Sequence, residues 1–154
     1  MAIIGTGPAA LMAASHLAGL PCSVSIFEKN AGAARKLLIA GGWGLNISNN
    51  LPPEEFAAQY TGDGIDWSKL LQNFSADEWL AFVQELQLET FLGTSGRYFV
   101  REMKASGLVT AWIGDLKSKG VIFHFRHELS DIDSTPDGRY ELAFCFPSAQ
   151  RGGR

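Results

Sequence analysis

A glycine-rich turn near the start of the sequence has the residue types that hold a diphosphate. Gly5, Gly7 and Ala10 follow the apolar stretch Met1–Ile4 in the pattern G-x-G-x-x-A. In such a turn the first glycine allows a tight bend, and the second lets a pyrophosphate approach the backbone. The third position needs a small residue for packing of the helix on the strand. The start of that helix would offer N–H groups and a partial positive charge to the anion.

An acidic residue stands where it can bind the ribose of an adenine nucleotide. Glu28 ends the stretch Ser23–Glu28, which is rich in β-branched and aromatic residues. It lies about 20 residues after the turn, the usual spacing in dinucleotide-binding units. A carboxylate there accepts hydrogen bonds from ribose hydroxyls and repels a 2′-phosphate, so we expect the site to reject NADP. The alternative is a glycine turn that binds nothing, with Glu28 on the surface.

The surrounding pattern predicts the elements that would position these groups. Met1–Ile4 is expected to form a strand, Ala9–Ala18 a helix and Ser23–Glu28 a second strand. A strand, a helix and a strand within about 30 residues indicate a crossover connection and a parallel sheet. The sequence therefore predicts an α/β fold that begins with a βαβ unit.

Basic residues and glycines follow the second predicted strand. Arg35 and Lys36 precede three glycines in residues 30–50, a segment that we expect to be an ordered loop. Glycines there would let the main chain lie against a flat ligand or form an anion-binding nest. The alternative is a surface loop with a solvated basic pair. The three glycines are Gly41, Gly42 and Gly44.

The remainder of the sequence alternates predicted helices and strands. Ser75 and Glu78 match a capping box, which predicts the start of a helix. Pro52 and Pro53 are expected to open another, with Asn50 as its cap. The predicted helices are 52–60, 66–74, 75–86 and 104–119, and the predicted strands are 89–92, 98–100, 121–126, 127–133 and 139–146, with a turn at 136–138.

Composition excludes several classes of function. The 154 residues are 46% hydrophobic with a net charge of −3, and no basic stripe suggests a nucleic-acid partner. No apolar run reaches the roughly 18 residues that cross a bilayer, so no membrane association is expected. Cys22 and Cys145 are expected to be buried free thiols in a reducing, cytoplasmic environment. The histidines His16, His124 and His127 form no metal-ligand pattern, so no metal site is predicted.

Longer motifs then point to a known family. They are Ile3–Ala14, Glu28–Lys29, Arg35–Gly42, Gly44–Asn49, Thr90–Phe99 and Met103–Ser106. With these motifs the sequence resembles the BaiN-like NAD(P)/FAD-dependent oxidoreductases of bacteria. More closely, it is similar to a flavoprotein branch of that family with a G-L-N-[IL]-[ST] segment. The similarity runs from residue 2 to about residue 133.

The resemblance implies a fold, a cofactor and a set of binding residues. The implied fold is a Rossmann-like FAD-binding domain of the two-dinucleotide-binding-domain flavoprotein type, incomplete, with a helical insert and a C-terminal β-hairpin. The implied cofactor is non-covalent FAD, with NAD(P)H as electron donor and a small-molecule substrate. Gly5, Gly7, Pro8, Ala9 and Ala10 would hold the diphosphate, Glu28 the ribose, and Lys29, Arg35 and Lys36 would line the nucleotide. Gly41, Gly42, Gly44, Leu45 and Asn46 would run beside the flavin, and Glu128 and Leu129 would meet the adenine through backbone groups.

The predicted domain organisation follows from this assignment. We expect a partial FAD-binding domain over residues 1–146 and a frayed tail over 147–154. Within the domain, residues 1–50 would form the βαβ unit and glycine-rich loop, 51–119 a mainly helical segment, and 120–146 a β segment. Family members continue far beyond this length, so the chain is expected to be an N-terminal or truncated portion of such a protein.

The sequence departs from the family at the glycine run. The broader family reads G-G-G-[RK]-C-N, whereas here Trp43, Gly44 and Leu45 replace the last glycine, the basic residue and the cysteine of that pattern. A cysteine-based redox role is therefore not expected, and no catalytic residue is assigned. Arg97 and Lys104 either neutralise a substrate or the reduced flavin, or are surface ions. Three interpretations stay open: an FAD-dependent oxidoreductase or its cofactor-binding portion, a non-catalytic ADP- or NAD-binding module, and a degenerate remnant.

Overall fold

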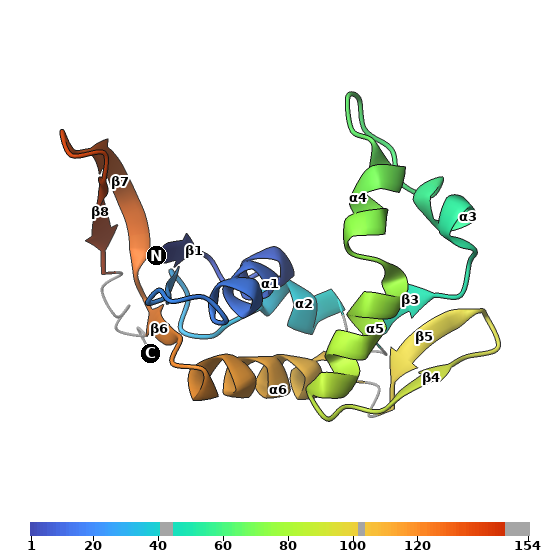
Figure 1. Ribbon diagram of the computed structural model, residues 1–154. Coiled ribbons are helices and arrows are strands. Elements are labelled where there is room, and N and C mark those ends of the chain that lie inside the picture. The colour runs from blue at the N-terminus through green and yellow to red at the C-terminus, as the bar shows by residue number, and fades with distance from the viewer. Residues whose placement is uncertain (41–44, 102–103, 147–154) are drawn as a thin grey trace, which may run out of the picture. The chain divides into compact units, whose positions relative to one another are not determined.

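The computed structural model describes residues 1–40, 45–101 and 104–146. The described chain divides into two compact units, shown as a ribbon in Figure 1. One comprises Met1–Leu37 with the described residues from Ile113 onward, and the other comprises Leu38–Trp112.

The first unit is built on a parallel sheet. Its strands are β1 (Ala2–Ile4), β2 (Ser25–Glu28) and β6 (Ile122–Phe125), in the order β1-β2-β6. Helix α1 (Pro8–Leu17) connects β1 to β2, so the predicted strand–helix–strand unit is confirmed. The central strand β2 carries the fully buried Ile26. Apolar residues at helical spacing on α1 are buried in the same way, which explains why this stretch forms a helix on the sheet.

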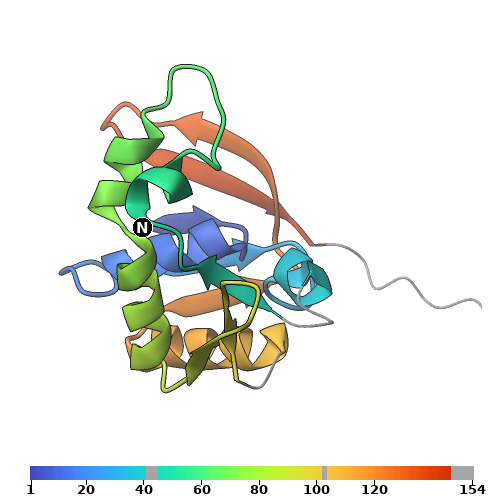
Figure 2. The ribbon, with the colours of Figure 1, turned by 90° about the vertical axis from the view of Figure 1, so that its right-hand side faces the viewer.

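An antiparallel hairpin completes the first unit. Strands β7 (Glu128–Ser134) and β8 (Tyr140–Cys145) pair along their length and form the long hairpin visible in Figure 2. At its turn the Gly138 N–H donates to the Thr135 carbonyl at 3.0 Å, and Gly138 has a φ of +78°. A left-handed conformation suits glycine, because it has no Cβ. The predicted C-terminal hairpin and its turn are therefore confirmed.

The second unit combines a small sheet with short helices. Its strands, in the order β3-β5-β4, are antiparallel. The predicted capping box is confirmed: the Ser75 Oγ accepts from the Glu78 N–H at 3.2 Å, and Glu78 Oε2 accepts from the Ser75 N–H at 2.6 Å. The strands are β3 (Asn46–Asn49), β4 (Thr90–Leu92) and β5 (Arg97–Val100), and the helices are α3 (Pro53–Ala57), α4 (Trp67–Asn73) and α5 (Ala76–Glu85).

Helix α6 (Ala105–Ser118) contributes residues to both units. In the second unit Trp112 is 1% exposed and its ring lies 5.5 Å from that of Trp79. In the first unit the Leu116 carbonyl accepts from the Val121 N–H at 3.0 Å, just before β6. Gly120, with a φ of +84°, ends the helix as predicted, because a left-handed residue there turns the chain out of the helix.

Three sequence-based expectations are wrong. Residues 30–50 are not simply a loop, because helix α2 (Arg35–Ala40) and strand β3 lie within them. Asn50 does not cap α3, whose cap position is Pro52 without a side-chain hydrogen bond. Both Cys22 and Cys145 are free but exposed instead of buried, because Cys22 lies in the surface loop after α1 and Cys145 ends a hairpin strand.

Candidate functional site

A pocket of about 540 Å³ lies in the first unit, where β1 and β2 end. Ligands of open parallel α/β sheets bind at the carboxyl ends of the strands, so this is the expected position for a site. Residues from the turn after β1, the end of β2, the start of α2 and the start of β7 form its walls. They are Ile4, Gly5, Thr6, Gly7, Pro8, Phe27, Glu28, Lys29, Asn30, Ala34, Arg35, Lys36, Leu37, His127, Glu128 and Leu129.

The glycine turn opens one wall of the pocket. Gly5 has a φ of +93°, a left-handed conformation that side-chain-bearing residues rarely adopt, and its N–H donates to the Phe27 carbonyl at 2.7 Å. Gly7 has an ordinary φ of −68°, and a Cβ added there would meet no protein atom within 4 Å. The two glycines therefore serve different purposes: Gly5 permits the bend, and Gly7 leaves open space.

Helix α1 begins directly at this open space. Gly7 is its N-cap, no side chain caps it, and its first turn contains no acidic residue. The N–H groups of Ala9 and Ala10 precede the first helical hydrogen bond, which Leu11 donates to the Gly7 carbonyl at 3.0 Å. N–H groups at this position have no partner within a helix, and the helix dipole makes the site favourable for an anion.

Glu28 is the central polar group of the pocket. The residue is 8% exposed, and its two carboxylate oxygens accept four hydrogen bonds. Oε2 accepts from the Thr6 N–H at 3.1 Å and from the Thr6 hydroxyl at 2.5 Å. Oε1 accepts from the Asn30 N–H at 2.8 Å and from the Asn30 side-chain amide at 2.6 Å. A carboxylate offers about four acceptor positions, so the protein itself fills those of Glu28.

These hydrogen bonds keep the carboxylate ionised. Burial by itself raises the pKa of Glu28, but the hydrogen bonds from the Thr6 hydroxyl and from the backbone and side chain of Asn30 outweigh it, with a smaller contribution from the Thr6 N–H. The pKa therefore lies below its ordinary value of 4.5. At neutral pH the pocket holds a fixed negative charge that accepts hydrogen bonds and repels a phosphate.

Thr6 connects three segments of the pocket. The residue is 2% exposed, and its hydroxyl donates to Glu28 while accepting from the Ala34 N–H at 3.1 Å. The glycine turn, the end of β2 and the approach to α2 are thus joined through one hydroxyl. Sequence reasoning did not identify Thr6, because it occupies a variable position of the glycine pattern and its partners lie 22 and 28 residues away.

Basic side chains surround this buried carboxylate. Lys29, Arg35 and Lys36 are exposed and line the pocket. Lys29 forms an ion pair of 3.5 Å with Glu128 at the start of β7. Both partners of that pair are at least half exposed, so its contribution to stability is small. These exposed cations therefore contribute positive charge at the mouth of the pocket and add little to the stability of the fold.

Aromatic rings form the apolar part of the pocket. Phe27 stacks on His124 with ring centroids 4.6 Å apart and on Phe144 with centroids 4.3 Å apart, so β2, β6 and β8 are joined beside it. His127 lines the pocket, and its Nδ1 lies 2.8 Å from the Phe125 carbonyl. Since a carbonyl only accepts, Nδ1 carries the proton in that contact.

The structure gathers a large part of the predicted set in this one pocket. The members that line it are Gly5, Gly7, Pro8, Glu28, Lys29, Arg35, Lys36, Glu128 and Leu129. Ala9 and Ala10 follow in the first turn of α1. Leu45, which is buried, and Asn46, which begins β3, belong to the second unit, as do the exposed Arg97 and Lys104. Gly41, Gly42 and Gly44 lie outside the described residues.

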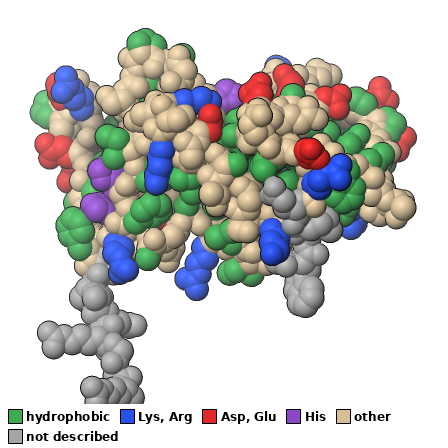
Figure 3. All heavy atoms as spheres, turned by 90° about the horizontal axis from the view of Figure 1, so that it is seen from below, with side chains coloured by type: hydrophobic (Ala, Val, Ile, Leu, Met, Phe, Trp, Pro, Cys, Tyr) green, Lys and Arg blue, Asp and Glu red, His purple; other side chains and the backbone are tan. Residues whose placement is uncertain are grey.

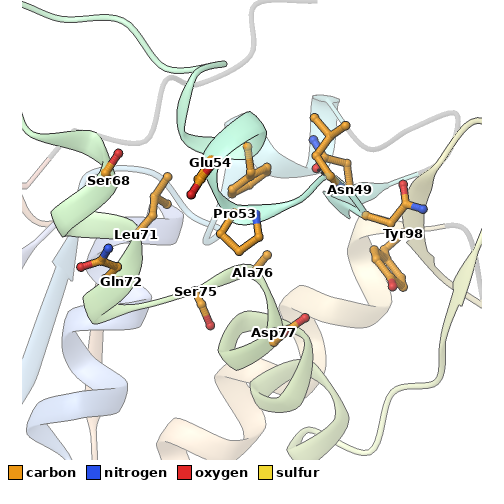
Figure 4. Close-up of a pocket in the computed structure, with 13 residues that line it drawn as sticks. Asn49, Pro53, Glu54, Ser68, Leu71, Gln72, Ser75, Ala76, Asp77 and Tyr98 are labelled. Atoms are coloured by element: carbon orange, nitrogen blue, oxygen red, sulfur yellow. Dashed lines mark hydrogen bonds between the residues drawn. The ribbon is translucent and has the colours of Figure 1, made fainter.

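A second cavity, of about 430 Å³, lies within the second unit (Figure 4). Pro53 of α3, Leu71 of α4 and Ala76 of α5 give it apolar walls, and Tyr98 of β5 borders it. None of the predicted binding residues that the structure describes lines it. Its described lining residues include no glycine and no basic side chain, which distinguishes it from the pocket of the first unit.

No group of three or more His, Cys, Asp or Glu residues in the described part of the chain could hold a metal ion. No helix in residues 1–40, 45–101 and 104–146 is long and apolar enough to cross a membrane. On the face shown in Figure 3, basic side chains stand apart from one another and form no continuous stripe.

Comparison with known families decides the classification. The profile described as "HI0933-like protein Rossmann domain" matches residues 1–149. The chain belongs to this family. The predicted Rossmann-like α/β fold is thereby confirmed. No curated protein matches the chain.

Solved structures with the same fold include three that illustrate its range. THI4 from Thermovibrio ammonificans has a TM-score of 0.59 at 17% identity, over 92% of this chain and 44% of that one. A 3-ketosteroid-Δ4-(5α)-dehydrogenase from Rhodococcus jostii RHA1 has a TM-score of 0.67 at 11% identity, over 96% and 42%. L-α-glycerophosphate oxidase from Mycoplasma pneumoniae, solved with FAD bound, has a TM-score of 0.53 at 12% identity, over 96% and 50%. The chain thus spans at most half of the length of these three proteins.

Proposed function

We propose that this HI0933-like chain binds FAD through the adenosine diphosphate half of the cofactor and forms the cofactor-binding part of a flavoprotein oxidoreductase. The observation that carries the proposal is the pocket that combines the glycine turn, the buried Glu28 carboxylate and three basic side chains. Each group suits a different part of one ligand. The turn suits a diphosphate, the carboxylate suits ribose hydroxyls, and the basic side chains balance the charge of the diphosphate.

The pocket fits such a ligand in size and chemistry. Its volume of about 540 Å³ lies within the roughly 300–1,000 Å³ of small-molecule sites. A Cβ added at Gly7 would meet no protein atom within 4 Å, and the first N–H groups of α1 are available to an anion bound in that space. FAD in the fold relative from Mycoplasma pneumoniae supports the choice of flavin over other adenine nucleotides.

The bound flavin would accept and donate electrons, and the protein would bind and orient it. In this proposal the glycine turn and α1 hold the diphosphate, while Lys29, Arg35 and Lys36 balance its charge. Glu28 receives the ribose and disfavours NADP, whose 2′-phosphate would meet a buried anion. The backbone of Glu128 and Leu129, which line the same pocket, contacts the adenine.

The electron donor follows from the finer resemblance to BaiN-like oxidoreductases. We propose NAD(P)H as the donor to the flavin and a small molecule as the final substrate. No side chain of the described residues is given a catalytic role, since the acidic and basic groups of the pocket are placed for binding.

Purification and cofactor release test the proposal. The purified chain is expected to show flavin absorbance at about 450 nm, and heat should release FAD identifiable by mass. A Gly7→Glu variant places a carboxylate in the open space and should be folded but colourless, which makes it a matched control. A folded, colourless wild type that takes up neither FAD nor ADP would overturn the proposal. Tight NADH binding without flavin would replace it with a nicotinamide-binding function.

A further inference from the structure

The hydrogen bonds of Glu28 leave no vacant acceptor for a ribose. All four donors to its carboxylate come from the protein: two N–H groups, one hydroxyl and one side-chain amide. A ribose hydroxyl that donates to Glu28 must therefore displace one of them. The structure allows the four donors to be ranked by how costly their release would be.

Two of the donors are held by the backbone. The Thr6 N–H lies inside the glycine turn and the Asn30 N–H directly follows the end of β2, so neither can leave without moving the main chain. The third donor is the hydroxyl of Thr6, a residue that is 2% exposed, and this hydroxyl also accepts from the Ala34 N–H at 3.1 Å. If this hydroxyl rotated away, the Glu28 carboxylate would lose a donor and the Ala34 N–H would lose its acceptor. Leaving two buried polar groups without these partners would cost free energy.

The fourth donor is different. The Asn30 side-chain amide donates to Glu28 Oε1 at 2.6 Å, but Asn30 is only partly buried and lines the pocket. Rotation of this side chain would move its amide towards solvent, where water replaces the lost partner at little cost. The Asn30 N–H would still hold Oε1 at 2.8 Å during that rotation.

We propose that the Asn30 side chain is a latch that occupies the ribose-binding position of Glu28 and is released when an adenine nucleotide binds. The inference rests on the proposed function. It makes Asn30 a positioning residue that keeps the buried carboxylate satisfied while no ligand is present. Ribose binding then exchanges one hydrogen bond for another instead of adding one, so part of the potential affinity is lost.

Nucleotide titrations with the Asn30→Ala variant test the latch. This variant keeps the backbone N–H and removes only the competing amide. ADP affinity is expected to rise about two- to tenfold, the value of one net hydrogen bond. The comparison with 2′-deoxy- and 3′-deoxy-ADP is sharper. In the wild type, a deoxy analogue that lacks the ribose hydroxyl aimed at Glu28 should bind only slightly more weakly than ADP, because the Asn30 amide stays on the carboxylate. In Asn30→Ala, removal of the same hydroxyl should weaken binding about two- to tenfold more than in the wild type.

Thr6→Val is the matched comparison, because it removes the other side-chain donor to the same carboxylate. It also strands the Ala34 N–H, so it should lower the melting temperature and give no gain in ADP affinity. A gain as large as that of Asn30→Ala would contradict the ranking of the two donors.

A spectroscopic measurement on the wild type requires no variant to fold. The side-chain amide resonances of Asn30 should shift when ADP is added and shift less with the deoxy analogue that lacks the competing hydroxyl. If ADP binds but these resonances stay fixed, or Asn30→Ala binds ADP no better, the latch is wrong while the proposed function stands. If neither protein binds ADP or FAD at all, the proposed function fails, and the latch fails with it.

Discussion

At the scale of single residues, Glu28 connects folding and binding. Its carboxylate is buried, ionised and held by Thr6 and Asn30, so it stabilises the end of β2 whether or not a nucleotide is present. A substitution that reverses its charge therefore tests folding and binding together. Glu28→Gln is more informative than Glu28→Arg, because it keeps the shape of the side chain.

Glu28→Gln is expected to lower the free energy of unfolding by about 1–3 kcal/mol. The reason is that the NH2 group of glutamine is itself a donor and would face protein donors at one of the two oxygen positions. Chemical denaturation measures this change, and titration with FAD should show weaker binding in the folded variant. Equal stability and equal FAD affinity would mean that Glu28 is neither a structural nor a binding residue.

The depressed pKa of Glu28 predicts the pH dependence of stability. Since the folded-state pKa lies below 4.5, the stabilisation is complete above pH 4.5 and is lost as the pH falls through the folded-state value. Thermal melts from pH 7 to pH 3 should show this loss. In Glu28→Gln the decline should be smaller, and an identical decline in both proteins would assign it to other groups.

The two glycines of the turn predict opposite effects of the same substitution. Gly5→Ala forces a side chain into a φ of +93° and should cost about 1–2 kcal/mol of stability. Gly7→Ala adds a Cβ at an ordinary φ, with no protein atom within 4 Å, so the fold should tolerate it while FAD affinity falls. Melting temperatures and FAD titrations of both variants separate the roles, and a Gly7→Ala variant with unchanged affinity would place the diphosphate elsewhere.

At the scale of elements, helix α5 shows how local chemistry fixes a boundary. Ser75 and Glu78 cap its first turn reciprocally, and the backbone and side chain of Ser75 hold the pKa of Glu78 below its ordinary value. The capping box of Ser75 and Glu78 could be predicted from the sequence because both of its hydrogen bonds join residues three positions apart.

Ser75→Ala should destabilise the chain by about 1 kcal/mol, since the Glu78 N–H loses its acceptor. For a protein of this size that corresponds to a melting temperature lower by about 2–4 °C. Ser75→Thr keeps the acceptor and should restore the wild-type value. A melting temperature in Ser75→Ala equal to that of the wild type would mean that the cap contributes nothing to global stability.

At the scale of the whole molecule, a ligand that binds only the folded state must raise its stability. At a free FAD concentration about 100 times Kd, the gain is about 2.7 kcal/mol. The melting temperature should then rise by about 5–10 °C. NADP at the same concentration should give a much smaller rise, because its 2′-phosphate would meet the buried Glu28 carboxylate. Equal rises with FAD and NADP would contradict the proposed ribose site.

The sequence by itself determined the features that depend on near neighbours. The capping box at Ser75, the hairpin turn at Gly138 and the helix end at Gly120 follow from residues a few positions apart, and the βαβ unit follows from consecutive local patterns for a strand, a helix and a second strand. Such contacts are specified by side-chain chemistry and backbone conformation within one turn of chain, so a pattern is enough to predict them.

Only the tertiary structure decided the features that depend on distant partners. Strand β3 exists because Asn46–Asn49 pairs with β5, whereas the sequence places these residues at the end of a predicted glycine-rich loop. The four hydrogen bonds on Glu28 likewise require Thr6, from a different strand end, to reach the carboxylate. Acidic type and spacing predicted where Glu28 would stand. Whether its acceptors were vacant depended on which donors the fold brought to it, and no local pattern encodes that.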